Sequence, residues 1–345
     1  MTEPAEVAGV PSPIPVIIDS DGCEVSCDAL WYALTSDELD VVAVTGALGV
    51  TSPEQAARNF CKVLHAAGRP DIPVGVGVGE RLGRAPDIPS PATVHGDDGL
   101  GGLHPDDAPF GPVDEPAADL IARLCADRPG ELAIAALGPF GNIARAVRAV
   151  PELGLHVRQL VVMGGAARPP GNATATGEYN VVFDPVAAHE MVHASWAVPP
   201  RMVGLDVTHV ATLSDAEFAV LEQRETPAAR FMAGPMTAYR PLSAAQTPDK
   251  TCPSHDTLAT MSLAHPDLLT CEELPITVDL AGGAAWGTTV VDLRPLALRG
   301  VELPPDLAAL ADAAFYTDRA RWQVALDADV EGFRSRVRSF YGGAR

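Results

Sequence analysis

Short runs of apolar, β-prone residues alternate along the chain with segments whose apolar positions recur at helical spacing. Such runs lie at residues 16–18, 39–46, 72–78, 132–138, 159–165 and 201–208. Strands that alternate with helices are typical of βαβ units, which place parallel strands side by side in one sheet. The pattern predicts an α/β fold with a mostly parallel central sheet, helices on both faces and a Rossmann-like core. Ligands of such folds bind at the carboxyl ends of the strands, so the polar residues there are examined first.

Helix boundaries are well marked in two parts of the chain. Ser52 suits the N-cap of a helix over residues 52–68, with Pro53 in its first turn and Gly68 at its end. Near the C-terminus, the pattern predicts a last strand around 322–327 and an amphipathic helix from about residue 330. We interpret the C-terminal part as scaffold.

Length and composition are compatible with one domain. The chain has 345 residues, of which 47% are hydrophobic, and this is enough for one large core. Residues 1–13 are rich in proline and acidic side chains, and we expect a flexible N-terminal segment there, followed by a single domain over 14–345. This segment lacks the basic and then apolar order of a signal peptide, and the chain has no apolar run of membrane-spanning length. A cytoplasmic location is expected.

Net charge and cysteine spacing exclude several classes of protein. The formal net charge is −21, which repels nucleic-acid backbones and anionic lipid head groups. We therefore expect neither a nucleic-acid nor a membrane partner. The six cysteines form no CxxC pair, so neither a disulfide framework nor a zinc ribbon is indicated and free thiols are expected.

Acidic residues gather where the first predicted strand ends. Asp19 and Asp21 follow the apolar run directly, and Cys27 and Asp28 come next on what is predicted to be the first turn of a helix. One interpretation is a haloacid-dehalogenase-type phosphatase, in which Asp19 attacks phosphorus and Asp21 acts as the acid or base beside magnesium. That class also needs a lysine after a later strand. The only two lysines, Lys62 and Lys250, do not follow a convincing strand.

The second interpretation is a hard-cation site completed by distant residues. Calcium prefers six to eight oxygen ligands, and a free position on it suits sugar hydroxyls and water. Asp256, beside His255 at the start of an apolar helix, is a candidate further ligand. The loop after residues 159–165 carries Asn172, Glu178 and Asn180, whose groups suit a polyol such as ribose. Ordinary helix capping and turn chemistry remain open alternatives for these residues.

A set of short motifs is distributed over nearly the whole chain. They are DSD…CDAL (19–30), SPEQAARN (52–59), AGRPDIPV (67–74), HGDDGLGG (95–102), LGPFGNIA (137–144), VVMGGAARPPGN (161–172), GEYNVVFDP (177–185), GLDVTH (204–209), HDTLA (255–259), GTTVVD (287–292) and VALDADVEGF (324–333). In these stretches the chain resembles the inosine-uridine preferring nucleoside hydrolase family. The resemblance implies a nucleoside hydrolase-like fold and calcium-dependent hydrolysis of the N-glycosidic bond of a ribonucleoside or modified nucleoside, which releases base and ribose. It also implies a homodimer or homotetramer.

The resemblance assigns roles position by position. Asp21 matches the general base that activates a metal-bound water, and it also contacts the calcium. The further metal positions are Asp28, Asp256 and the backbone carbonyl of Gly141, with Asp19 as a supporting acid. Residues at ribose-contacting positions are Met163, Asn172, Glu178 and Asn180. His255 matches a histidine proposed to protonate the leaving base in some subgroups.

The chain also departs from the family pattern. Cys27 stands where an acid of the first motif contacts a ribose hydroxyl, and a thiol is a poor hydrogen-bond acceptor. Val25 also replaces an acid of the longer form of this motif, and Ala47 or Gly49 takes the place of the amide after the second strand. We expect Cys27 to alter substrate contact rather than to act as a nucleophile. We interpret His95 and His209 as structural, and Tyr239 and Arg240 as candidates to cover the base. A catalytically altered nucleoside-binding homologue remains an alternative.

Overall fold

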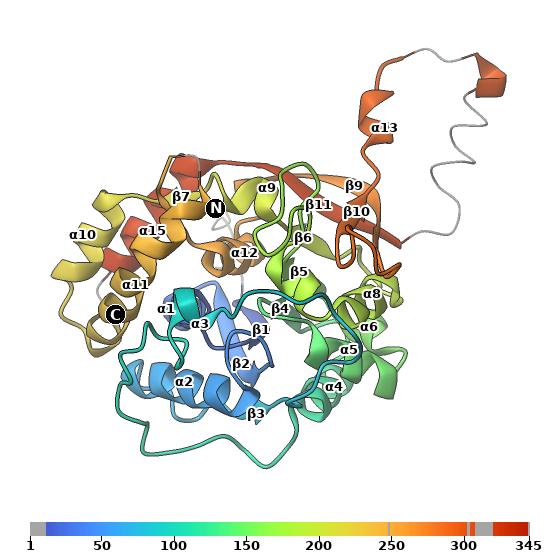
Figure 1. Ribbon diagram of the computed structural model, residues 1–345. Coiled ribbons are helices and arrows are strands. Elements are labelled where there is room, and N and C mark those ends of the chain that lie inside the picture. The colour runs from blue at the N-terminus through green and yellow to red at the C-terminus, as the bar shows by residue number, and fades with distance from the viewer. Residues whose placement is uncertain (1–11, 248, 302–303, 308–319, 344–345) are drawn as a thin grey trace, which may run out of the picture.

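The computed structural model describes residues 12–247, 249–301, 304–307 and 320–343. Residues 1–11, where most of the flexible N-terminal segment is predicted, lie outside the described residues. Within these ranges, one sheet has nine strands in the order β10-β9-β11-β6-β5-β4-β1-β2-β3 (Figure 1). Its strands are β1 Ile14–Ser20, β2 Leu39–Gly46, β3 Val74–Val76, β4 Ala133–Ala136, β5 Gln159–Met163, β6 Arg201–Val203, β9 Leu269–Val278, β10 Thr289–Val291 and β11 Ala320–Ala328. The short strands β7 (Thr212–Leu213) and β8 (Cys252–Pro253) pair separately.

The central sheet is mostly parallel, as the sequence predicts. Every neighbouring pair from β11 to β3 is parallel, whereas β9 is antiparallel to both β10 and β11. At the carboxyl end of β1, Asp19 lies opposite Thr45 of β2 on one side and Ala136 of β4 on the other. This register brings the ends of three strands together beside the acids of the first motif.

Helices cover both faces of the sheet. Val16 and Ile18 of β1 pack into one hydrophobic cluster, and Ile17 between them packs into a second cluster, because successive strand residues point to opposite faces. The first cluster includes residues of α1, α2, α11, α12 and α15, and the second includes residues of α4, α5 and α8. The helices are α1 Glu24–Thr35, α2 Pro53–Ala66, α3 Ala92–His95, α4 Ala117–Asp127, α5 Gly141–Ala149, α6 Leu153–His156, α7 Tyr179–Phe183, α8 Pro185–His193, α9 Leu205–Thr208, α10 Asp215–Gln223, α11 Pro227–Ser243, α12 His255–Ala264, α13 Arg294–Ala297 and α15 Val330–Gly342, with 3-10 turns at Ala244–Gln246 and Pro266–Leu268. The predicted fold class is confirmed.

The local predictions can be compared element by element. The Ser52 side chain accepts a hydrogen bond from the backbone N–H of Gln55 at the start of α2, and Gly68 takes a φ of 71° after its end. β11 and α15 match the strand and helix predicted at the C-terminus. The single strand predicted over 201–208 is wrong, since β6 ends at Val203 and the next residues form α9.

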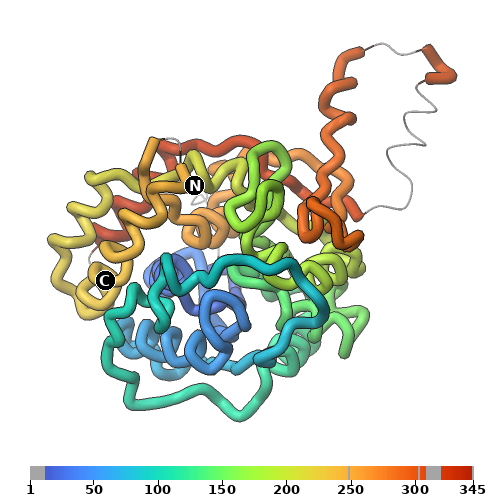
Figure 2. Tube along the Cα trace, in the orientation of Figure 1, coloured from blue at the N-terminus to red at the C-terminus, as the bar shows by residue number. Residues whose placement is uncertain are grey.

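Three further features complete the description of the fold. The loop from β3 to α3 runs from the edge of the sheet back toward β1, and the segment with α13 extends away from the sheet (Figure 2). In the part of the chain that the structure describes, no helix is both long and apolar enough to cross a membrane.

Candidate active site

The site begins with a sharp turn at the end of β1. Asp19 is the penultimate residue of β1, and Asp21 is the first residue after the strand. Both side chains are buried. Gly22 then takes a φ of 71°, and a Cβ atom there would lie 2.4 Å from the Cα of Ala56. Only glycine fits this close approach to α2. The turn leads directly into α1, with Cys23 at the N-cap, so the acids and the helix start are fixed together.

A serine hydroxyl joins two carboxylates that are far apart in the sequence. The Asp21 Oδ2 atom accepts a hydrogen bond from the backbone N–H of Val50 at 2.8 Å. Ser26 Oγ donates to Asp256 Oδ2 at 2.9 Å and lies 3.5 Å from Asp21 Oδ1. Burial raises the pKa of both carboxyls, and charge repulsion from Asp21 raises the pKa of Asp256 further. β1 and α12 therefore bring two acids to one buried point.

The donor set at this point fits a hard divalent cation. Asp19 Oδ1 accepts hydrogen bonds from Thr45 and Asn142, but its Oδ2 atom is buried without a partner in the structure. Burial raises the pKa of Asp19 to about 6. Among the described residues that line the adjoining pocket, there is no lysine or arginine to balance these acids. Clustered carboxylate and hydroxyl oxygens without a cationic side chain are the ligand type that calcium or magnesium prefers.

Asp28 does not belong to this group, contrary to the sequence-based expectation. Its Oδ2 atom accepts a hydrogen bond from Thr257 Oγ1 at 2.7 Å, and its Oδ1 atom accepts one from the hydroxyl of Tyr341 at 3.0 Å. The reason is helical geometry, because side chains two residues apart point to different faces of a helix. Ser26 faces Asp21 and Asp256, whereas Asp28 faces Thr257 of α12 and Tyr341 of α15. Burial raises the pKa of Asp28 to about 7.

Cys27 and Gly141 are also not brought to the pocket. The Cys27 side chain is fully buried, and its thiol donates to the carbonyl of Gly22. The structure therefore does not bring Cys27 to the pocket, and its contact with ribose stays a prediction. Gly141 is the first residue of α5, and its carbonyl accepts a hydrogen bond from the Arg145 guanidinium at 3.2 Å. Neither residue is among those that line the pocket.

The predicted ribose-binding residues form the opposite wall. Glu178 is the N-cap of α7, and its carboxylate accepts hydrogen bonds from the backbone N–H groups of Gly165 and Asn180, both at 3.0 Å. Burial raises its pKa to about 7. The amide nitrogen of Asn180 donates to the carbonyls of Leu137 and Met163, so its oxygen is the group left to accept a hydrogen bond from a ligand. These contacts fix the wall before a ligand arrives.

Asn172 and His255 are the remaining predicted site residues that line the pocket. Asn172 Oδ1 accepts from the backbone N–H of Tyr179 at 2.9 Å. At the start of α12, His255 Nδ1 lies 2.7 Å from Thr208 Oγ1. Burial, with His209 and His95 nearby, lowers the pKa of His255 to about 3, so this imidazole is neutral near pH 7.

Several of these groups line one cavity that opens to solvent. The sequence-predicted residues in its wall are Asp21, Met163, Asn172, Glu178, Asn180, His255 and Asp256. The wall also contains Cys23, Val50, His95, Leu137, Tyr179, Tyr239 and Gln246.

Some of these additional residues carry signals in the sequence. His95 belongs to the HGDDG motif, but we interpreted it as structural, whereas it lines the cavity and stacks on Tyr239 with ring centroids 5.4 Å apart. Tyr239 thus lies where a covering residue was expected, while Arg240 pairs with Asp215 instead. Ser26 lies in the first turn of α1, on the side that faces Asp21 and Asp256.

The chain is similar to known proteins over most of its length. The family model described as inosine-uridine preferring nucleoside hydrolase matches residues 16–335. The pyrimidine-specific ribonucleoside hydrolase RihA of Klebsiella pneumoniae is 34% identical over 283 residues, which cover 81% of this chain and 88% of the relative. A solved purine-preferring ribonucleoside hydrolase from Gardnerella vaginalis has a TM-score of 0.83 and 28% identity, covering 95% of this chain and 98% of that one. A plant nucleoside hydrolase, the PpNRh1 enzyme, gives 0.82 and 28%, over 96% and 99%.

Proposed function

The chain belongs to the inosine-uridine preferring nucleoside hydrolase family, and we propose that Asp21, assisted by a calcium ion, carries its reaction. It is an N-ribosyl hydrolase, which cleaves the N-glycosidic bond of ribonucleosides. The proposed substrate is a ribonucleoside or modified nucleoside, and the products are the free base and ribose. The observation that supports this best is that Asp21 and Asp256 lie in one cavity with Glu178, Asn180 and His255.

Calcium is proposed from the chemistry of the donors. Asp21 and Asp256 would hold the ion, with the Ser26 hydroxyl between them and Asp19 as a supporting acid. When bound, calcium supplies positions for ribose hydroxyls and lowers the pKa of nearby water. Its positive charge would also keep buried carboxyls ionised near pH 7, although burial alone raises their pKa values.

In the proposed reaction, some side chains act at the ribose end of the N-glycosidic bond and others act at the base end. The Asp21 carboxylate takes the proton from the attacking water as general base. Glu178 and the Asn180 oxygen accept hydrogen bonds from ribose hydroxyls, which orients the sugar and stabilises positive charge that develops on its ring. His255 donates a hydrogen bond to the leaving base from its ring N–H. Because this imidazole is neutral near pH 7, it assists the base through the hydrogen bond of its N–H group and not as an imidazolium cation.

This function is tested with a panel of purine, pyrimidine and modified ribonucleosides, because the named relatives differ in base preference. Free base and reducing sugar are measured with calcium and after its removal by a chelator. We expect turnover that needs calcium and falls by about 10² to 10⁴-fold in Asp21→Asn.

Asp28→Asn is the matched control for this experiment. It makes the same chemical change at a buried acid of the same motif, but Asp28 contacts Thr257 and Tyr341 rather than the cavity. We expect it to keep calcium binding and most activity. Equal loss of activity in both variants, without loss of folding, would contradict the proposed roles, as would turnover that does not respond to the chelator.

A further inference from the structure

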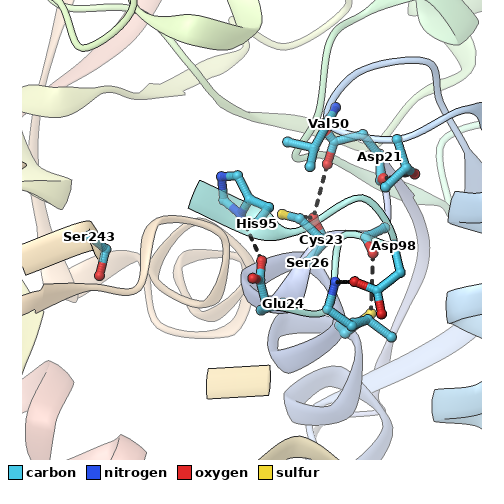
Figure 3. A network of polar contacts seen from close by, with 12 residues as sticks. Asp21, Cys23, Glu24, Ser26, Val50, His95, Asp98 and Ser243 are labelled. Carbon is cyan, nitrogen blue, oxygen red and sulfur yellow. Dashed lines mark hydrogen bonds and ion pairs between the residues drawn. The ribbon is translucent and has the colours of Figure 1, made fainter. Parts of the chain in front are cut away.

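A second group of metal-binding side chains lies beside the carboxylate pair. The Cys23 thiol, the Glu24 carboxylate and the His95 imidazole each place one ligand atom within 4.8 Å of the other two. Cys23 and Glu24 come from the start of α1, and His95 is the last residue of α3. Figure 3 shows His95 directed at the Glu24 carboxylate, with the Cys23 sulfur beside the ring. Segments about seventy residues apart thus bring sulfur, nitrogen and oxygen donors to one point.

Glu24 supplies a buried carboxylate oxygen that has no hydrogen-bond partner. Its side chain is fully buried, with 0% exposure. One oxygen, Oε2, lies 2.7 Å from His95 Nδ1, but Oε1 has no hydrogen-bond partner in the structure. Leaving a buried carboxylate oxygen unpaired is costly, and native proteins usually pair such an atom with a donor, a water or a metal.

We propose that Cys23, Glu24 and His95 bind a thiophilic divalent cation of the zinc class, at a site separate from the one proposed for calcium. The donor chemistry distinguishes the two sites, because thiolate and imidazole ligands favour zinc and its neighbours, whereas carboxylates and hydroxyls favour calcium. Cys23 and His95 both line the cavity, whereas Glu24 lies behind them. Three protein ligands leave a fourth position for water or a ligand group, as in zinc sites that take part in reactions.

The surroundings hold the three ligands in place. His95 stacks on Tyr239 with an interplanar angle of 20°. Asp98 holds the loop after His95 together, because its carboxylate accepts hydrogen bonds from three backbone N–H groups of that loop at 2.7 to 2.8 Å. The Asn59 amide donates to the carbonyls of Gly22 and Asp98, which ties the start of α1 to this loop. Such outer contacts fix the orientation of metal ligands in known sites.

The alternative is a buried hydrogen-bonded histidine–glutamate pair with no metal. In that arrangement Cys23 stays a thiol, hydrogen-bonded to Ser26 Oγ at 3.2 Å. The two arrangements differ in whether Cys23 forms a bond to a metal, and this difference has a spectroscopic signature. Cobalt(II) is the probe, because a cobalt–thiolate bond gives a charge-transfer band in the near ultraviolet.

The experiment titrates the metal-free full chain with cobalt(II) in saturating calcium, which occupies the oxygen site. We expect the band to rise to one equivalent and to disappear when zinc displaces cobalt. Cys23→Ser should abolish the band, and Cys61→Ser, at a buried thiol of α2 outside the group, should retain it. Absence of the band in the unchanged protein, or its persistence in Cys23→Ser, would overturn the proposal.

Two further variants keep the test decisive if Cys23→Ser does not fold. Glu24→Gln and His95→Gln preserve side-chain size, and we expect each to weaken zinc binding by at least about tenfold in a chelator competition. Circular dichroism shows whether they are folded. Unchanged zinc affinity in folded variants would refute the site, while Asp21→Asn should keep the cobalt band because it alters the other site.

Discussion

The protonation state of His255 decides how it can assist the leaving base. Burial lowers its pKa to about 3, so above that value the ring is neutral and the proton available to the substrate is an N–H proton. Thr208 Oγ1 lies 2.7 Å from Nδ1. If the threonine donates to Nδ1, the ring proton lies on Nε2, and the proposed role requires this tautomer.

His255→Ala therefore separates two kinds of substrate. We expect hydrolysis of an ordinary nucleoside to fall by about 10² to 10⁴-fold, since its base leaves poorly without a hydrogen-bond donor. A riboside of p-nitrophenol has a leaving group that is stable as an anion, and its hydrolysis should change little. The measurement is kcat for both substrates with the unchanged enzyme and the variant. Equal losses on both substrates would show that His255 does not act on the leaving group.

The acids of the first motif show what a sequence does and does not reveal at the scale of single residues. Asp21 and Asp256 were found because strand ends and helix starts are visible in the pattern of apolar positions. Asp28 was predicted as a metal ligand from the family resemblance, whereas helical phase directs it to Thr257 and Tyr341 in the structure. Ser26, two residues earlier, lies between the two carboxylates instead. The surroundings of the Glu24 carboxylate include His95 of α3. The sequence of α1 alone therefore could not show that the other Glu24 oxygen has no hydrogen-bond partner.

At the scale of elements, α2 holds the two loops that carry the site. The Asn59 amide nitrogen donates to the carbonyls of Gly22 at 2.9 Å and Asp98 at 2.7 Å. It therefore joins the turn after β1 to the loop after α3. The turn contains Asp21 and Cys23, and the loop directly follows His95, and these three residues line the cavity. A change at Asn59 should therefore act on the site without touching substrate.

We predict that Asn59→Asp lowers the free energy of unfolding by about 1 to 3 kcal/mol, because a buried carboxylate would face two carbonyl oxygens. It should also reduce kcat/KM as the two loops separate. Glu54→Gln, an amide and acid exchange at an exposed position of the same helix, serves as the control and should change neither quantity. Urea unfolding gives the free energies. An Asn59→Asp protein as stable as the control would contradict the structural role assigned to this amide.

The elements themselves were largely predictable, and the reasons for the exceptions are physical. Parallel strands buried on both faces are nearly continuous apolar runs, so β2, β4 and β5 were evident. The run over 201–208 is equally apolar, but Asp206 accepts hydrogen bonds from the backbone of Ala167 and Arg168, and the chain turns into α9 after Gly204. Pairing of β9 with β10 and β11 joins distant segments, and periodicity carries no information about such pairing.

At the scale of the whole molecule, buried carboxyls make stability depend on pH and metal together. Without metal, burial raises the pKa to about 6 for Asp19 and to about 7 for Glu178, from ordinary values of 3.8 and 4.5. The folded state then binds more protons than the unfolded state over these intervals, so stability falls as pH rises through them. His255 has the opposite effect. Its lowered pKa means that stability falls as pH drops from 6.5 toward about 3.

Calcium competes with protons for the same carboxylates, so we predict that the rise in melting temperature on adding calcium is larger at pH 8 than at pH 5. Each tenfold gain in affinity adds about 1.4 kcal/mol of stability once the ion is in excess. The comparison uses the difference between calcium and chelator at each pH, because the effect of His255 is common to both and cancels. The increment should be small at every pH in Asp21→Asn. An increment that is constant or shrinks as pH rises would mean that calcium does not bind these acids, since protons would no longer oppose its binding.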